Sequence, residues 1–332
     1  MNTELLKRLS LGTSSFAALR GSNEIYVDKT SYIYRLASNR GKYFLARPRR
    51  FGKSLLISTF ESLFKNGLRD FQGLVIEKLW KEEKSYEVVR LDFARVKPDG
   101  SFKEFRDYFD DYLESQFRKI GFKRSGANFF TNLLEAFIES LPNSSLVLLI
   151  DEYDAPLTEC LDDPQLYLQV RNFLSKFYSI FKSNDAALRF LFITGITKFN
   201  KASIFSELNN LSDISLSAEY GSLLGYTHHE VQEYFAEYLI SASEILGTSK
   251  EELFQELTEH YDGFCFERTA RQKVFAPWSL LKFFSDPGSG LIDYWFESGG
   301  KPSVLVKYLQ PHSLRNCQAT SLSTPQMNKP LF

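Results

Sequence analysis

The octapeptide that decides the fold is Arg47-Pro48-Arg49-Arg50-Phe51-Gly52-Lys53-Ser54. A short apolar run at residues 43–46 precedes it, and from Lys53 apolar residues recur at helical spacing until Gly67. This order of strand, loop and helix is that of phosphate-binding loops of the GxxxxGK[ST] type. In such loops, backbone N–H groups at the start of the helix surround the phosphates. The lysine reaches the outer phosphates and the serine binds Mg²⁺.

One position of this pattern carries an unexpected residue. Arg47 stands where the motif has its first glycine, and a Gly-Lys-Ser tripeptide by itself is a weak signal. A solvated turn with a cluster of arginines would have the same sequence. From this segment alone, phosphate binding and an ordinary turn are equally good interpretations.

A second segment favours nucleotide binding. Residues 146–150 form a continuous apolar run, as in a strand buried on both faces, and Asp151 and Glu152 follow directly. Ligands of open parallel sheets bind at the carboxyl ends of the strands. One carboxylate can hold Mg²⁺, while the next can polarise a water for attack on the terminal phosphate. A solvated acidic turn would explain this segment alone, but the loop and the acidic strand end together predict a nucleotide site.

A third strand-like run, residues 188–193, ends in Thr194. This hydroxyl could sense the terminal phosphate or orient the attacking water. A threonine at a strand end is more often a simple turn residue, so Thr194 adds little by itself.

Strand-like and helix-like segments alternate through residues 1–225, which predicts an α/β fold with a parallel P-loop NTPase sheet flanked by helices. A strand is expected near residues 88–93 and a helix over about 128–141. Residues 226–310 show only helical patterns, including pieces at 278–284 and 302–309, and predict a helical lid domain. Residues 311–332 are polar and aperiodic and predict a disordered tail. Capping boxes mark three helix starts, at Ser101/Glu104, Thr227/Glu230 and Ser249/Glu252.

Composition excludes several other classes. Of the 332 residues, 43% are hydrophobic and 24% charged, which is the balance of a globular protein. Lys and Arg total 40 against 41 Asp and Glu, so the surface is not uniformly basic as in a protein that coats nucleic acid. Three widely spaced cysteines give no disulfide framework or metal motif. With no signal peptide and no apolar run long enough for a membrane, we expect a cytoplasmic protein without a membrane partner.

With these segments in hand, the sequence resembles the AAA-ATPase-like proteins of bacteria and other microbes. These are P-loop proteins that are often fused to a nuclease-like domain of the PD-(D/E)XK type. The resemblance covers about residues 10–309, and the arginines of the loop are part of the family pattern. The matching stretches lie at residues 25–30, 47–55, 149–156, 194–199, 203–211, 261–264 and 294–296.

The resemblance implies a role for each matching residue. Lys53 would contact the outer phosphates, Ser54 and Asp151 would hold Mg²⁺, Glu152 would activate water, and Thr194 would act as the polar sensor. It also implies ATP as the nucleotide, and no guanine-selective Asn/Thr-Lys-x-Asp motif appears beyond the strands. The nucleotide would be held by the loop residues Arg50, Phe51, Gly52, Lys53, Ser54 and Leu55.

The roles of Arg47, Arg49 and Arg50 do not follow from the motif. Their guanidinium groups could stabilise charge on a phosphate, bind a nucleic-acid backbone, or pair with acids such as Asp154. The segment containing Asp28 and Lys29 lies upstream of the first core strand. A structural role is expected there, with an adenine-side role as the alternative.

The chain departs from the family pattern in two places. Ala276 stands where the family usually has an asparagine before Pro277, and no nuclease-like segment follows residue 296. The polar sequence from Pro311 would suit a truncated or frame-shifted gene. The sequence therefore predicts an ATP-binding switch that hydrolyses ATP with Mg²⁺ and acts on an unknown protein partner. The alternative is a non-hydrolysing nucleotide- or nucleic-acid-binding adaptor.

Overall fold

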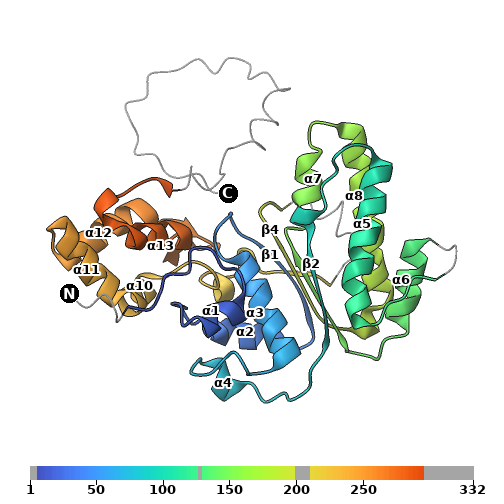
Figure 1. Ribbon diagram of the computed structural model, residues 1–332, viewed down its shortest axis with the longest axis horizontal. Helices are drawn as coiled ribbons and strands as arrows, with labels where there is room; N and C mark the ends of the chain where they lie inside the picture. The colour runs from blue at the N-terminus through green and yellow to red at the C-terminus, as the bar shows by residue number, and fades with distance from the viewer. Residues whose placement is uncertain (1–5, 126–128, 199–209, 295–332) are drawn as a thin grey trace.

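The computed structural model describes residues 6–125, 129–198 and 210–294. Its centre is a five-stranded sheet in the order β2-β3-β4-β1-β5, with all neighbouring strands parallel (Figure 1). This arrangement confirms the predicted α/β fold with a P-loop type of sheet. The strands are β1 (Gly41–Ala46), β2 (Glu87–Asp92), β3 (Leu146–Asp151), β4 (Leu188–Gly195) and β5 (Ser212–Asp213).

Helices cover both faces of the sheet, because alternate residues of the central strands point to opposite sides. In β3, Leu148 belongs to the core on one face and Leu149 to the core on the other. The first face is covered by α5 (Phe102–Phe117), α6 (Phe130–Glu139), α7 (Ala155–Glu159) and α8 (Pro164–Ser183). The second is covered by α1 (Phe16–Gly21), α2 (Thr30–Ala37), α3 (Lys53–Asn66) and α4 (Ile76–Leu79).

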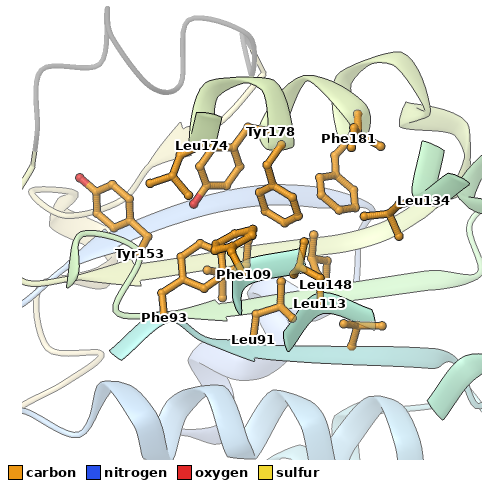
Figure 2. Close-up of a cluster of buried hydrophobic side chains, with 14 of the residues drawn as sticks. Leu91, Phe93, Phe109, Leu113, Leu134, Leu148, Tyr153, Leu174, Tyr178 and Phe181 are labelled. Carbon is orange, nitrogen blue, oxygen red and sulfur yellow. The ribbon is translucent and has the colours of Figure 1, made fainter. Parts of the chain in front are cut away.

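The core beneath α5 and α8 is rich in phenylalanine. Figure 2 shows Phe109 and Leu113 of α5 meeting Leu174, Tyr178 and Phe181 of α8 over the strands. All five side chains are almost completely buried. Their burial fixes α5 and α8 against β2 and β3, and thereby fixes the strand ends that carry the acidic residues.

Up to residue 294, where the described residues end, the C-terminal region contains four α-helices and a small hairpin. The helices are α10 (His228–Tyr234), α11 (Ala236–Leu246), α12 (Lys250–Tyr261) and α13 (Pro277–Ser285). They lie beside α1 and α3, away from α5 and α8 (Figure 1). Their shared core includes Val231, Leu253 and Leu280 and extends to Val27 of the N-terminal segment. The region is helical as predicted, while the boundary at residue 225 stays a prediction.

Several local expectations can be compared with the structure. The three capping boxes are present, and Gly67 follows the last residue of α3. Phe93 starts a 3₁₀ turn (Phe93–Arg95) instead of ending the second strand, because the Asp92 side chain accepts the N–H of Ala94 and turns the chain. The expected helix at 302–309 and the tail at 311–332 lie outside the described residues.

One element of the C-terminal region was missed by the sequence analysis. Residues Phe264–Cys265 (β6) pair antiparallel with Lys273–Val274 (β7) to form a two-stranded ribbon. Each strand is two residues long, which is too short to produce an alternating pattern of polar and apolar residues. This hairpin contacts the loop at residues 47–52, as described below.

Candidate functional site

The loop at residues 47–52 joins the end of β1 to the start of α3. Gly52 precedes the helix with a φ of 93°, in the left-handed region that favours glycine. Gly52 has no side chain with which to cap the helix, and the first turn of α3 carries the N–H groups that a helix cannot satisfy internally. Arg50 is also left-handed, with a φ of 65°, which costs a non-glycine residue roughly 1 kcal/mol. The loop therefore presents a helix N-terminus with the free amides that an anion requires.

Lys53, the first residue of α3, folds back into the loop. Its Nζ donates hydrogen bonds to the backbone oxygens of Arg47 at 3.0 Å and Pro48 at 2.8 Å. Burial lowers the pKa of Lys53, and the nearby carboxylates of Asp151 and Glu152 oppose that shift. The ammonium group thus lies in a water-poor environment between the loop and the acidic strand end.

The carboxyl ends of β3 and β4 bring Asp151 and Thr194 together. Both side chains are buried, and the Thr194 hydroxyl donates to Asp151 Oδ1 at 2.5 Å. The same Asp151 oxygen accepts the N–H of Glu152 at 3.1 Å. Thr194 therefore fixes the orientation of the Asp151 carboxylate.

Glu152 follows the strand in a left-handed conformation, with a φ of 51°. Burial raises the pKa of Glu152, and the negative charge of Asp151 adds to the rise, while Lys53 opposes it. A strained backbone of this kind persists only where the surroundings hold it. Glu152 is half-buried and close enough to Lys53 for the ammonium charge to act on its carboxylate.

A cavity of about 510 Å³ lies against these residues. Its walls include Arg49 through Leu55 of the loop, Glu152, and Trp278 of α13. Further walls come from the N-terminal stretches 10–14 and 25–27, from Lys29 and from residues 223–226. Asp151 and Thr194 do not line the cavity, and Asp151 is joined to the cavity residue Glu152 by the hydrogen bond from the Glu152 N–H. The structure thus gathers the six predicted loop residues, Arg50 to Leu55, with Glu152 around one cavity of a size usual for small-molecule sites.

Arg47 does not face this cavity. It is only 1% exposed, and its guanidinium donates to the backbone oxygens of Ala46, Ser215 and Tyr220 at 2.7–3.1 Å. The guanidinium also lies over the ring of Phe266, 4.2 Å from its centroid. Burial lowers the pKa of Arg47 to about 9. Arg47 is therefore not placed to bind a phosphate, a nucleic-acid backbone or Asp154, in contrast to the roles considered for it from the sequence.

Arg49 and Arg50 are exposed and line the cavity. The guanidinium of Arg50 stacks on Trp278, 3.9 Å from the ring centroid. Of the three loop arginines, these two are the ones that a ligand in the cavity could reach.

Two residues next to Glu152 have a positioning role that the sequence analysis did not assign. Asp154 is buried, and its Oδ2 accepts the N–H groups of Ile196 and Thr197 at 2.9 and 2.7 Å. The Tyr153 hydroxyl donates to the Thr197 carbonyl at 3.0 Å. Together they tie the acidic strand end to the turn after β4. Both residues lie within the family motif at 149–156, and this motif was the feature of the sequence from which their role could have been predicted.

The segment around Asp28 makes structural contacts, and its neighbours Val27 and Lys29 also line the cavity, so the choice between a structural and an adenine-side role stays a prediction. Asp28 accepts the N–H of Thr30 at 2.8 Å and that of Val75 at the same distance. Lys29 forms a buried ion pair with Glu230 at 2.5 Å and so joins the N-terminal segment to the capping box of α10. No spacing rule pointed to this segment or to Trp278 as walls of the cavity.

The donor set fits Mg²⁺, which prefers oxygen ligands and keeps several waters. The Ser54 hydroxyl in the first turn of α3 and the Asp151 carboxylate are the residues that would hold it. Within the described ranges, no group of three or more His, Cys, Asp or Glu side chains is arranged to hold a metal. A cation that takes most of its ligands from phosphate and water needs fewer from the protein.

These features are those of a P-loop protein with a cavity beside its loop. The chain belongs to the AAA-ATPase-like family of predicted AAA-ATPases, which matches residues 10–205. A protein described as an uncharacterized protein in the vnfD 5′ region of Azotobacter chroococcum mcd 1 is 33% identical over 311 residues. The match covers 91% of this chain and 56% of that protein, so the chain spans a little over half the length of its relative.

Among solved structures, Cdc6p from Pyrobaculum aerophilum is 15% identical and aligns with 61% of this chain and 45% of its own length. The TM-score is 0.30, a similarity too low to carry an argument about this chain. In the part of the chain that the structure describes, no helix combines the length and apolar character that crossing a bilayer demands.

Proposed function

We propose that this protein binds ATP with Mg²⁺ in the cavity beside α3, hydrolyses it, and acts as a nucleotide-dependent switch. One observation carries the proposal: a helix N-terminus, the buried Lys53 and the half-buried Glu152 all meet at the same 510 Å³ cavity. Membership of a family of predicted AAA-ATPases supports the choice of ATP.

The loop supplies the phosphate end of the site. The free amides from Phe51 to Leu55 surround the phosphates and the positive end of the helix dipole attracts them. Lys53 exchanges its two loop carbonyls for phosphate oxygens, which are charged and accept stronger hydrogen bonds. This exchange makes binding depend on the negative charge of the ligand.

The strand ends supply the metal and water positions. Ser54 and Asp151 would hold Mg²⁺, whose charge would neutralise that of the phosphates, and Thr194 keeps the Asp151 carboxylate in place. Glu152 lines the cavity and would accept a proton from the water that attacks the terminal phosphate as the bond to ADP breaks. Burial raises the pKa of Glu152, which strengthens it as a base.

The cavity also has walls that suit a purine base. They include Ile25, Val27, Trp278 and Leu281, which offer apolar and aromatic surface. Such a surface binds the flat face of a base.

The test is a measurement of Mg-ATP binding and of phosphate release with the purified chain, its Glu152→Gln variant and a control, Glu87→Gln. Glu87 is exposed and begins β2, at the opposite end of the sheet from the site. We expect Glu152→Gln to bind ATP like the parent and to release phosphate at least about a hundredfold more slowly, since general-base catalysis contributes 10²–10⁴. Glu87→Gln should behave as the parent.

Parent protein that binds ATP but releases no phosphate would support the alternative of a non-hydrolysing adaptor. Absence of ATP binding by the parent would reject the proposed site altogether. Repeating the assay with DNA at two salt concentrations tests the nucleic-acid alternative, because contacts of Arg49 and Arg50 with phosphates would weaken steeply as salt rises.

A further inference from the structure

Three residues that make this loop unlike a glycine-rich loop, Arg47, Arg50 and Phe51, contact the C-terminal region. Arg47 lies over Phe266 at 4.2 Å, and Arg50 lies over Trp278 at 3.9 Å. Between them, Phe51 packs edge to face against Phe266, with ring centroids 5.1 Å apart. Phe264 makes a similar contact with Phe51 at 4.8 Å. Aromatic and cation–π contacts thus hold three positions of one short loop.

The hairpin region that makes three of these four contacts has its own packing and hydrogen bonds. Phe51, Phe266, Val274 and Ala276 form a small core of their own, in which Phe51 is the residue from the loop. The turn of the hairpin is fixed by Glu267, whose carboxylate accepts the N–H groups of Arg271, Gln272 and Thr269. The hairpin, with Phe264 and Phe266, therefore packs against the loop through residues that do not line the cavity.

Phe266 does not line the cavity, and so it cannot touch a ligand there. The ring of Phe266 contacts two residues of the loop, Arg47 and Phe51, and these contacts are the route by which we expect it to act on nucleotide binding. Arg47 is also connected directly to Lys53, because the backbone oxygen of Arg47 is one of the two acceptors of the Lys53 ammonium group. Two contacts therefore connect Phe266 to Lys53: the ring of Phe266 lies under the Arg47 guanidinium, and the Arg47 carbonyl accepts a hydrogen bond from Lys53.

We propose that Phe266 is a positioning residue for the nucleotide site: through Arg47 and Phe51, the β6–β7 hairpin holds the loop in the shape that exposes its amides. The inference rests on the proposed function for its ligand. Because coupling between two sites is reciprocal, occupancy of the cavity must also alter how firmly the C-terminal region is held. The arginines of this loop thus link the nucleotide site to the C-terminal region.

The first measurement is the Kd for a non-hydrolysable ATP analogue with Mg²⁺. We compare the parent with Phe266→Ala, Phe266→Tyr and the control Leu253→Ala. Leu253 is fully buried in the core of the C-terminal helices and is absent from the small core that holds Phe51. Loss of the ring should weaken binding about tenfold, since it removes a desolvated cation–π contact and an aromatic pair. Phe266→Tyr should restore the parent value, and Leu253→Ala should leave the Kd unchanged in folded protein.

The second measurement needs no nucleotide. Hydrogen exchange of the loop amides at residues 49–55 should be about tenfold faster in Phe266→Ala than in the parent, and unchanged in Leu253→Ala. Faster exchange in protein that binds no nucleotide would support the positioning role while rejecting the proposed function. Parent-like exchange and a parent-like Kd in Phe266→Ala would overturn the inference and leave the proposed function intact. An equal effect of Leu253→Ala would also overturn it, since that would show general destabilisation.

Discussion

Two buried cations lie in the same loop, six residues apart, and they have different surroundings. Lys53 faces the cavity, donates to two carbonyls of its own loop, and lies near the carboxylates of Asp151 and Glu152. Arg47 faces the opposite side, where its guanidinium donates to Ser215 and Tyr220 in a distant part of the chain. Both have lost most of their contact with water, but the acceptors around Lys53 can be exchanged for a ligand.

This difference follows from the chemistry of the two side chains. An ammonium on a flexible stem can turn from one set of acceptors to another, which suits a group that meets a ligand. A guanidinium has five donors in a rigid plane and keeps its geometry once several are engaged. The loop therefore uses lysine where contacts change and arginine where they stay, and substitutions at the two positions should have different consequences.

The largest effect is expected at Lys53. Lys53→Ala removes the cation that meets the phosphates, and the loss of one partner of a desolvated charge pair should weaken Mg-ATP binding about a thousandfold. Equilibrium dialysis would measure it. The matched control is Lys65→Ala, an exposed lysine near the end of the same helix. Unchanged affinity in Lys53→Ala would mean that the phosphates lie elsewhere.

Arg47→Met should act on folding. Methionine fills a similar volume but leaves the carbonyls of Ala46, Ser215 and Tyr220 without their donor. We expect the free energy of unfolding in urea to fall by about 3 kcal/mol. The exposed Arg268, replaced in the same way, should change it by less than about 0.5 kcal/mol. An unfolding curve like that of the parent would show that Arg47 has no structural role.

Thr194→Val adds a third case to the comparison of Lys53 with Arg47. It removes the hydrogen bond from Thr194 to Asp151 without changing any charge. The buried Asp151 would lose its 2.5 Å hydrogen bond, at a cost of about 1 kcal/mol in the free energy of unfolding. Phosphate release should slow about tenfold while ATP affinity stays near that of the parent, since Asp151 is less well oriented for Mg²⁺. If Thr194 senses the phosphate directly instead, ATP affinity should fall along with the rate.

The sequence was sufficient to predict the parts of the site that depend on local chain order. A strand, a loop with Gly52 and Lys53, and a helix follow one another directly, so their arrangement is encoded in adjacent residues. Asp151 was predictable because strands of a parallel sheet end at a common edge. The position of Arg47 was not predictable, because its partners Ser215, Tyr220 and Phe266 come from segments far along the chain, and spacing rules hold no information about them.

The smallest expected effect is a pH dependence of stability. It tests whether the charge of Glu267 stabilises the β6–β7 hairpin that packs against Arg47. Hydrogen bonds from Thr269 and from the backbone of Gln272 lower the pKa of Glu267 to about 2, below the value of about 4.3 for a free glutamate. A lowered pKa in the folded state stabilises the fold above pH 4 or so, and this contribution is lost as the pH falls toward 2. Glu267→Gln should therefore lower the urea midpoint at pH 7, and the gap from the parent should narrow between about pH 5 and pH 3. A gap independent of pH would show that the charge of Glu267 contributes nothing, and that the hairpin beneath Arg47 is held by packing alone.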